Sequence, residues 1–262
     1  MSDETSDVPS DVPSDVPSDV PSDVMEGSAD DRGPGGASAR NGEALRPAAF
    51  FDMDNTLLRI DSGMSWTRFL YRRGELRASM IAKALYWRTL YKLAVLDMDT
   101  VFTRLCLEIA GDSEDEMIAK CDVWYRQHLA PEIAPAARVA IEHHRQAGHV
   151  VVLATGSTCY AARPVARDLG IDHVLSTELE VDATTRAFTG RPSALCFGTH
   201  KVALAEAWAA RHGVDLAQSY FYSDSYNDLP MLERVGTAIA INPDARLRRH
   251  AARRGWPVRH WT

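Results

Sequence analysis

Residues 50–58 have the sequence Phe50-Phe51-Asp52-Met53-Asp54-Asn55-Thr56-Leu57-Leu58, in which an apolar run ends in two carboxylates one residue apart, followed by a hydroxyl. The pattern predicts a buried strand over Ala48–Met53, which the chain leaves where the two carboxylates appear. Uncompensated carboxylates at the end of a buried strand are costly, and a bound cation removes that cost. Open α/β sheets also place their ligands at the carboxyl ends of strands. A strand that ends in a solvated acidic turn is the alternative, and this stretch alone does not decide between the two.

The charge of the chain is unevenly distributed. The 262 residues are 45% hydrophobic, which is enough for a sizeable core, and their net charge is −7. Residues 1–31 contain ten acidic residues and no Lys or Arg, so removing their −10 from the total of −7 leaves +3 for the rest. A body so close to neutral predicts no nucleic-acid partner.

The cysteines and the first residues predict a cytoplasmic protein. Cys106, Cys121, Cys159 and Cys196 lie far apart without a CxxC pair, as is typical of thiols that stay reduced. None begins a Cys-x5-Arg phosphate loop, which excludes the cysteine-dependent phosphatases. The start lacks the basic and apolar regions of a signal peptide, and no uncharged apolar run reaches the roughly 18 residues of a transmembrane helix. Peripheral contact with a membrane stays open.

Three regions differ in composition. Residues 1–46 begin with a Ser-Asp-Val-Pro repeat, whose prolines forbid helix and whose single Val supplies no core, so we expect a disordered acidic tail and linker. Residues 47–61 and 135–262 alternate strand-like and helix-like stretches and are predicted to form one core. Residues 62–134 show no strand pattern and predict an all-helical insertion. Its helices are expected at Met64–Arg73, Leu76–Leu96, Asp99–Ala110 and Ser113–Leu129.

The alternation of strands and helices predicts an α/β fold with a doubly wound parallel sheet. The insertion follows the carboxylates of the first strand directly, so it would lie above the carboxyl edge of the sheet as a lid. Further strands are expected at His149–Ala154, His173–Ser176, Ser219–Ser223 and Thr237–Ile241, and a small hairpin at Glu178–Thr189.

Two later segments could bind an anion. The apolar strand that begins at Val150 ends in Thr155-Gly156-Ser157, where Thr155 could donate to a phosphate oxygen and Gly156 lets backbone N–H groups approach it. Lys201 opens a helix, at the unfavourable end of the helix dipole, and makes more sense beside an anion. Each segment is weak evidence alone, because Thr-Gly-Ser turns and exposed lysines are both common.

A second pair of carboxylates follows another predicted strand, in Ser223-Asp224-Ser225-Tyr226-Asn227-Asp228. Asp224 and Asp228 can join Asp52 and Asp54 around one cation if the two strand ends are neighbours. Mg2+ fits best, because it takes an oxygen-only octahedral shell made of few carboxylates, waters and a substrate phosphate.

Together, Asp-x-Asp-x-Thr, a strand-end Thr, a Lys and Asp-x-x-x-Asp resemble the four motifs of the haloacid dehalogenase-like hydrolase superfamily, from Phe50 to the C-terminus. The position of the helical insertion is similar to the C1-type cap of subfamily IB, the phosphoserine phosphatase-like branch. The resemblance implies a Rossmann-like core and Mg2+-dependent hydrolysis of a small phosphorylated metabolite through an aspartyl-phosphate intermediate.

The resemblance also implies roles for the motif residues. Asp52 would be the nucleophile and Asp54 the general acid/base. An Asp at the second position distinguishes phosphatases from the superfamily's dehalogenases, which do not use this acid. Of the remaining residues, Thr155, Gly156 and Lys201 would hold the phosphoryl group, Asp224 would bind Mg2+ with Asp52 and the Asp54 carbonyl, and Asp228 and Asn227 would orient metal-bound water and substrate.

The substrate depends on the insertion, where Trp66 and Arg68 lie closest in sequence to the nucleophile and are candidate pocket residues. Core packing for Trp66 and a surface ion pair for Arg68 are equally common. The phosphoserine phosphatase branch usually has a Glu for the substrate amine soon after the first motif, but here none follows until Glu75, and Asp61 is the only nearby acid. That departure weighs against phosphoserine; related proteins act on histidinol phosphate or on phospholipid head-group phosphates.

Three alternatives share parts of this chemistry. Phosphotransferases of the same superfamily have the same motifs, and product analysis separates them from hydrolases. A receiver domain also uses Asp, Thr and Lys around Mg2+, but with different spacing, in a shorter chain and without a later Asp-x-x-x-Asp. A non-catalytic phosphate-binding module would have no need for the expected residue at every catalytic position, yet all are present.

Overall fold

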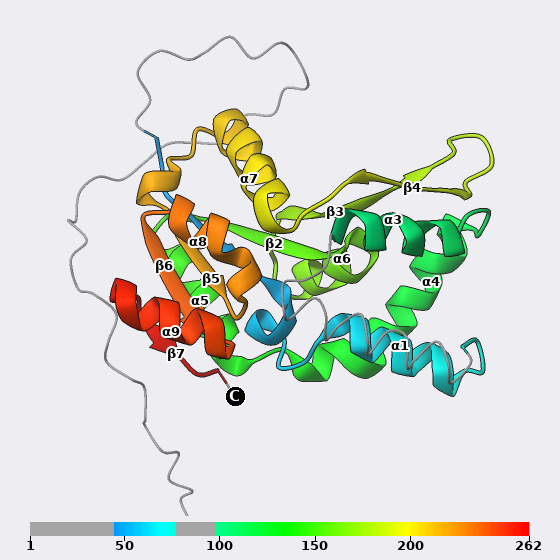
Figure 1. Ribbon diagram of the computed structural model, residues 1–262, viewed down its shortest axis with the longest axis horizontal. Helices are drawn as coiled ribbons and strands as arrows, with labels where there is room; N and C mark the ends of the chain where they lie inside the picture. The colour runs from blue at the N-terminus through cyan, green and yellow to red at the C-terminus, as the bar shows by residue number, and fades with distance from the viewer. Residues whose placement is uncertain (1–44, 77–97, 262) are drawn as a thin grey trace, which may run out of the picture. The chain divides into compact units, whose positions relative to one another are not determined.

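The computed structural model describes residues 45–76 and 98–261, which contain a seven-stranded sheet with the order β4-β3-β2-β1-β5-β6-β7 (Figure 1). Neighbouring strands are parallel except for the antiparallel pair β3–β4. The predicted α/β fold with a mostly parallel sheet is therefore confirmed. The strands span Ala48–Phe51 (β1), Val150–Thr158 (β2), His173–Val181 (β3), Phe188–Ala194 (β4), Tyr220–Ser223 (β5), Thr237–Ile241 (β6) and Val258–Arg259 (β7).

Helices cover both faces of the sheet. Figure 1 shows α7, α8 and α9 on one face and α5 and α6 on the other. The α-helices span Ser62–Arg72 (α1), Met98–Glu108 (α3), Glu114–Trp124 (α4), Pro135–Gln146 (α5), Cys159–Asp168 (α6), Gly198–His212 (α7), Leu229–Arg234 (α8) and Ala245–Arg254 (α9). Short helical turns span Met53–Leu57 (η1), Tyr125–Leu129 (η2), Ala130–Glu132 (η3), Leu216–Gln218 (η4) and Tyr226–Asp228 (η5).

Strand β1 is buried on both faces, which explains its continuous apolar sequence. Phe50 packs on the side of α7, where its ring meets Trp208 edge-on at a centroid distance of 5.6 Å. Phe51 points to the opposite side and stacks on Tyr222 of β5 at 4.5 Å. Burial of each phenyl ring contributes roughly 2 kcal/mol relative to exposure. The strand is thus held firmly at the point where Asp52 begins the next segment.

The ends of the first two predicted strands need correction. β1 ends at Phe51 and not at Met53, because from Asp52 the backbone turns into η1. β2 continues beyond Ala154 to Thr158, and its pairing with β3 shifts register between those two residues. The irregularity therefore falls in the segment that contains Thr155, Gly156 and Ser157.

The helices predicted for the insertion occur where the structure describes them. Met64–Arg73 and Asp99–Ala110 correspond to α1 and α3, with ends shifted by one or two residues. The predicted helix Ser113–Leu129 is α-helical only to Trp124 and continues as the wider turn η2. The helix predicted at Leu76–Leu96 lies outside the described residues except for Leu76. Of the tail and linker predicted for residues 1–46, only the last two are described, and there the predicted boundary is wrong: Arg46 already joins the core, where it pairs with Val214 and its N–H donates to the Gly213 carbonyl at 3.1 Å.

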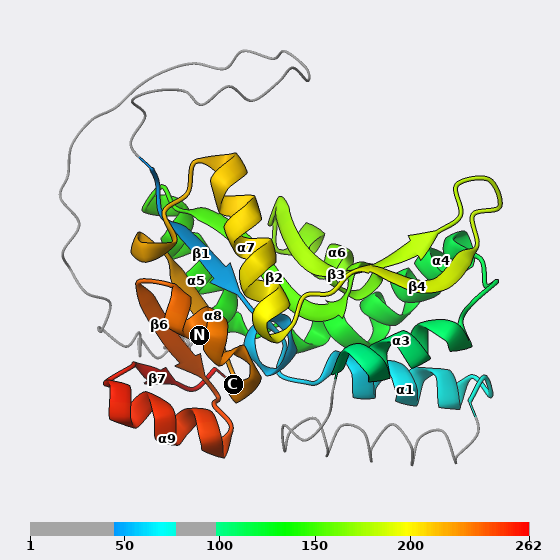
Figure 2. The same cartoon turned by 45° about the horizontal axis from the view of Figure 1, so that its top comes forward.

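The hairpin predicted at Glu178–Thr189 exists, but its first arm is the end of β3, which runs without a break from the predicted strand His173–Ser176, and its second arm, β4, continues to Ala194. It packs against α3 of the insertion (Figure 2). The Gly111 N–H donates to the Phe188 carbonyl at 2.8 Å. Gly190 has φ +83°, and a Cβ there would lie 2.9 Å from the Ala110 Cβ, so both the conformation and the close approach require glycine. Among the described residues, no helix has the length and apolar character needed to cross a membrane.

Candidate active site

The segment after β1 turns back towards the end of β5. Asn55 adopts a left-handed conformation (φ 52°), which asparagine tolerates better than most residues. Its side-chain amide donates to Asp224 Oδ2 at 3.2 Å, while the Asn242 amide donates to the Asn55 carbonyl at 3.1 Å. The Asp52 N–H donates to the Tyr222 carbonyl at 2.9 Å. These bonds join the first acidic motif to the last.

A buried lysine lies between two carboxylates of these motifs. Lys201, in the first turn of α7, has its Nζ 2.9 Å from Asp52 Oδ1 and 2.7 Å from Asp228 Oδ1. All three residues are buried. The Ser223 hydroxyl donates to Asp228 Oδ2 at 2.7 Å and fixes that carboxylate from its other side. The buried ammonium thus has a carboxylate partner on each of two sides, which offsets the cost of burying its charge.

Two serines hold Asp54. The Ser157 hydroxyl of β2 donates to Asp54 Oδ2 at 2.8 Å, and the N–H of Ser62, the first residue of α1, donates to Asp54 Oδ1 at 2.5 Å. The two serine hydroxyls are 3.0 Å apart. The sequence contained both serines in the segments around the motifs, but nothing in their spacing predicted that they would meet on Asp54.

The other candidate residues lie around this centre. Thr155 is buried, and its Oγ1 accepts from the Ser157 N–H at 3.1 Å, so it is linked to Asp54 through Ser157. The Gly156 carbonyl accepts from the Thr177 hydroxyl at 2.9 Å. Asn227 lies in η5, directly before Asp228, and its N–H donates to the Ser225 hydroxyl at 3.2 Å.

The site holds more negative than positive charge. Burial raises the pKa of the Asp52 carboxyl to about 7; Lys201 opposes the rise, while the carboxylates of Asp228 and Asp54 add to it. Burial, together with the charge of Asp52, also raises the pKa of Asp224 well above its usual value. Burial alone would lower the pKa of Lys201, but Asp228 and Asp52 raise it, so its ammonium stays charged.

The carboxylates of the site fit a magnesium ion, although they do not form a complete metal-binding cluster by themselves. Within the described residues, no group of three or more His, Cys, Asp or Glu side chains is placed to hold a metal ion. Mg2+, however, is usually held by one or two carboxylates together with waters and a substrate phosphate. Asp52 and Asp224 supply two carboxylates at the ends of the neighbouring strands β1 and β5. The excess negative charge and the oxygen-only donors match that ion.

The two candidate pocket residues of the insertion differ in environment. Trp66 meets Trp124 of α4 edge-on at 5.0 Å and stacks on Phe69 at 5.5 Å, so much of its ring packs between helices. Arg68 is exposed. Asp61 caps α1 by accepting from the Met64 N–H at 2.9 Å, and Glu75 pairs with Arg73 and Lys120. Both nearby acids thus have structural partners.

Comparison with known proteins places this chain in a family. A family model described as haloacid dehalogenase-like hydrolase matches residues 49–233. A histidinol-phosphatase of Neisseria meningitidis is 30% identical over 222 residues, which cover 82% of this chain and 98% of that protein. A phosphoserine phosphatase of Mycobacterium tuberculosis is 36% identical over 220 residues, which cover 82% of this chain and 71% of that protein.

Solved structures share the fold of this chain. A Bordetella pertussis protein of unknown function is 34% identical with a TM-score of 0.72, over 82% of this chain and 98% of that one. A phospho-aspartyl intermediate analogue of phosphoserine phosphatase shares the fold, with a TM-score of 0.62 at 17% identity, over 83% of this chain and 94% of that one. By the family model and these relatives, the chain belongs to the haloacid dehalogenase-like hydrolases, in the phosphoserine phosphatase-like branch of phosphatases.

Proposed function

We propose that the chain is a Mg2+-dependent phosphomonoesterase that acts on a small phosphorylated metabolite through an aspartyl phosphate on Asp52. The observation that carries the proposal is the contact of Lys201 with both Asp52 and Asp228, beside a separately held Asp54. The proposed nucleophile Asp52 thereby lies beside the Lys201 ammonium at one edge of the sheet. Asp54, two residues further on, supplies a second carboxyl group that is proposed to reach the leaving oxygen of the substrate. A phosphotransferase would use the same assembly with a different acceptor.

In the first half-reaction, a carboxylate oxygen of Asp52 attacks phosphorus and the bond from phosphorus to the leaving oxygen breaks. A phosphomonoester dianion repels this carboxylate, and the buried Lys201 ammonium offsets that repulsion. Thr155 and the backbone at Gly156 are proposed to hold the phosphoryl oxygens, with Asn227 and Asp228 orienting the substrate. When bound by Asp52, the Asp54 carbonyl and Asp224, Mg2+ would supply further charge neutralisation.

Asp54 is proposed to move the protons. Burial raises the pKa of its carboxyl, which favours the protonated form that can donate to the departing alkoxide. The resulting carboxylate then takes a proton from the water that attacks the aspartyl phosphate. The bond between phosphorus and the Asp52 oxygen breaks, which regenerates the Asp52 carboxylate and releases inorganic phosphate. The hydrogen bonds from Ser157 and Ser62 hold both oxygens of Asp54 in place.

The proposed function is tested by a panel of phosphorylated metabolites incubated with Mg2+. The panel contains phosphoserine, histidinol phosphate and a phospholipid head-group phosphate, and inorganic phosphate is measured directly. We expect Mg2+-dependent phosphate release from at least one small metabolite. Phosphate release that persists in chelator, or transfer to an alcohol acceptor without release, would contradict it.

Stability should depend on pH and Mg2+ together. The Asp52 carboxyl loses its proton near pH 4 when unfolded but near 7 when folded, so without metal the free energy of unfolding falls as pH rises through that window. Mg2+ at saturating concentration should raise the melting temperature by roughly 5–10 °C at pH 8, and by less at pH 5, where Asp52 is protonated. Asp224→Asn should abolish the shift, whereas Asp112→Asn, an exposed control, should keep it.

The insertion is proposed to act as a lid that selects substrates, with Arg68 and the accessible part of Trp66 facing the bound metabolite. Arg68→Ala should then raise KM for the preferred metabolite about tenfold, with little change for a small generic phosphate that barely touches the lid. Arg163→Ala, which removes an exposed arginine of α6, is the matched control. Parallel losses on both substrates would show that Arg68 has a structural role.

A further inference from the structure

Helix α9 is unusually basic. Its ten residues include Arg246, Arg248, Arg249, Arg253 and Arg254, together with His250. The apolar residues Leu247 and Ala251 are buried against the core, so the charged side chains occupy the remaining surface of the helix. No part of the proposed reaction uses this helix.

Four of these basic residues line one hollow. Arg246, Arg249, His250 and Arg253 are spaced i, i+3, i+4 and i+7, which places them on one side of α9. With Tyr226 of η5 they line a cavity of about 260 Å³. We call these five residues the arginine pocket.

In the part of the chain that the structure describes, the three arginines of the arginine pocket form no ion pair with a carboxylate, whereas its histidine does. Among the described residues, the basic groups of α9 that pair with a carboxylate are His250 and Arg254, which lie 3.5 Å and 3.8 Å from Glu233. His250 Nε2 is buried and has no hydrogen-bond partner there. The nearby Asp244 carboxylate is occupied by backbone N–H groups, those of Tyr226, Arg246 and Leu247.

Arg246 is held in a suitable orientation. Its guanidinium carbon lies 4.3 Å from the centre of the Tyr226 ring, a cation–π contact that fixes the group. A guanidinium stacked on its face keeps its N–H groups at the edge, in the fork that matches phosphate oxygens. Together with the guanidinium groups of Arg249 and Arg253, which line the same hollow, Arg246 would attract an anion with several oxygens.

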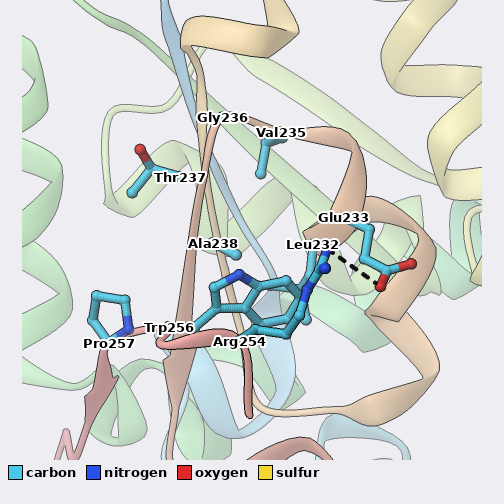
Figure 3. A pocket seen from close by; sticks show the side chains of 9 residues that line it. All are labelled: Leu232, Glu233, Val235, Gly236, Thr237, Ala238, Arg254, Trp256 and Pro257. Atoms are coloured by element: carbon cyan, nitrogen blue, oxygen red, sulfur yellow. Dashed lines mark ion pairs between the residues drawn. The ribbon is translucent and has the colours of Figure 1, made fainter. Parts of the chain in front are cut away.

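The neighbouring cavity provides a contrast. It has a volume of about 320 Å³ and is lined by residues that include Glu233, Arg254 and Trp256 (Figure 3). There the arginine already pairs with Glu233 and lies over the Trp256 ring at 5.7 Å. Among the described residues, none of the three arginines of the arginine pocket has such a carboxylate partner.

We propose that the arginine pocket is a second anion site, separate from the active site, that binds the phosphoryl group of a small soluble molecule. A liquid water occupies about 30 Å³, so the cavity holds a diphosphate or a phosphorylated group of a few heavy atoms. A lipid surface could offer the same phosphoryl chemistry. A membrane-surface helix, however, exposes large apolar side chains for insertion, and those of α9 are buried.

The test is calorimetric titration of sodium pyrophosphate into the full chain in chelator at constant ionic strength. Arg249→Gln should weaken binding about tenfold, through loss of one charge-assisted contact, and Arg249→Gln with Arg253→Gln should abolish it. Arg248→Gln is the matched control: it lies next to Arg249, is also exposed and also donates to a backbone carbonyl, but does not line the pocket. It should change the affinity less than about twofold.

Several results would overturn the proposal. Equal weakening by Arg248→Gln and Arg249→Gln would show diffuse attraction by the helix, and binding that survives in the double variant would place the anion elsewhere. Anionic phosphatidylglycerol vesicles that bind in an Arg249-dependent way, without any binding of pyrophosphate, would assign the pocket to a lipid surface. Melting curves confirm that each variant folds. Because chelator removes Mg2+-dependent phosphate binding, failure here leaves the proposed phosphatase function unaffected.

Discussion

Replacement of Asp52 with asparagine is expected to reduce phosphatase turnover about 10⁴-fold or more, which is the scale of losses when a covalent nucleophile is removed. An amide cannot attack phosphorus at a useful rate, although it has nearly the volume of the carboxyl group. Lys201 would keep its contact with Asp228 at 2.7 Å, so the buried ammonium would retain a counter-ion. The loss should therefore appear in turnover and not in folding.

The stability of the same variant provides the control. Because burial raises the pKa of Asp52 to about 7, its charged form is unfavourable in the metal-free protein at pH 8. Asp52→Asn should then melt at the same temperature as the parent chain, or higher, when both are metal-free. Asp112→Asn, at an exposed position, should match the parent in turnover and stability. Substantial activity in Asp52→Asn, measured as phosphate release, would refute the proposed nucleophile.

The edge at which the candidate site forms was predictable, because parallel strands present their carboxyl ends on the same side of a sheet. Asp52 follows β1 and Asp224 follows β5, and the two strands are neighbours. The contact of Lys201 with Asp52 and Asp228 follows similar logic, since a lysine at a helix start is stabilised by an anion. Local pattern and sheet geometry thus predict which charged residues gather.

Contacts between segments that are distant in the sequence could not be predicted from it. Ser62 and Ser157 are 95 positions apart, and their meeting on Asp54 depends on how the insertion enters and leaves the core. The packing of Trp66 on Trp124 likewise depends on the angle between two helices, which periodicity does not specify. β7 has only two residues and follows a proline, so it lacks the length of a recognisable strand signal.

Replacement of Asp54 with asparagine should slow alkyl phosphates by about 10² to 10⁴-fold, the usual contribution of a general acid or base. Alkoxides leave poorly without a proton, and the variant has none to give. An activated aryl phosphate releases a stable phenolate, so formation of the aspartyl phosphate on Asp52 should be nearly unaffected. Its hydrolysis still needs a base. The aryl substrate should therefore give a rapid burst of phenolate, close to one per enzyme, followed by slow turnover.

The burst separates the role of Asp54 as general acid from its role as general base. It is measured as phenolate absorbance after rapid mixing of enzyme and substrate. Ser157→Ala removes the hydroxyl that donates to Asp54 Oδ2 at 2.8 Å and should show the same preference for aryl substrates in weaker form, because the carboxyl remains but is less well oriented. Equal losses on alkyl and aryl phosphates without a burst would mean that Asp54 does not transfer protons. If the serine variant also gives a phenolate burst followed by slow turnover, its Asp54 carboxyl group is present but does not act as a base. That result would show that the base function depends on the orientation of Asp54.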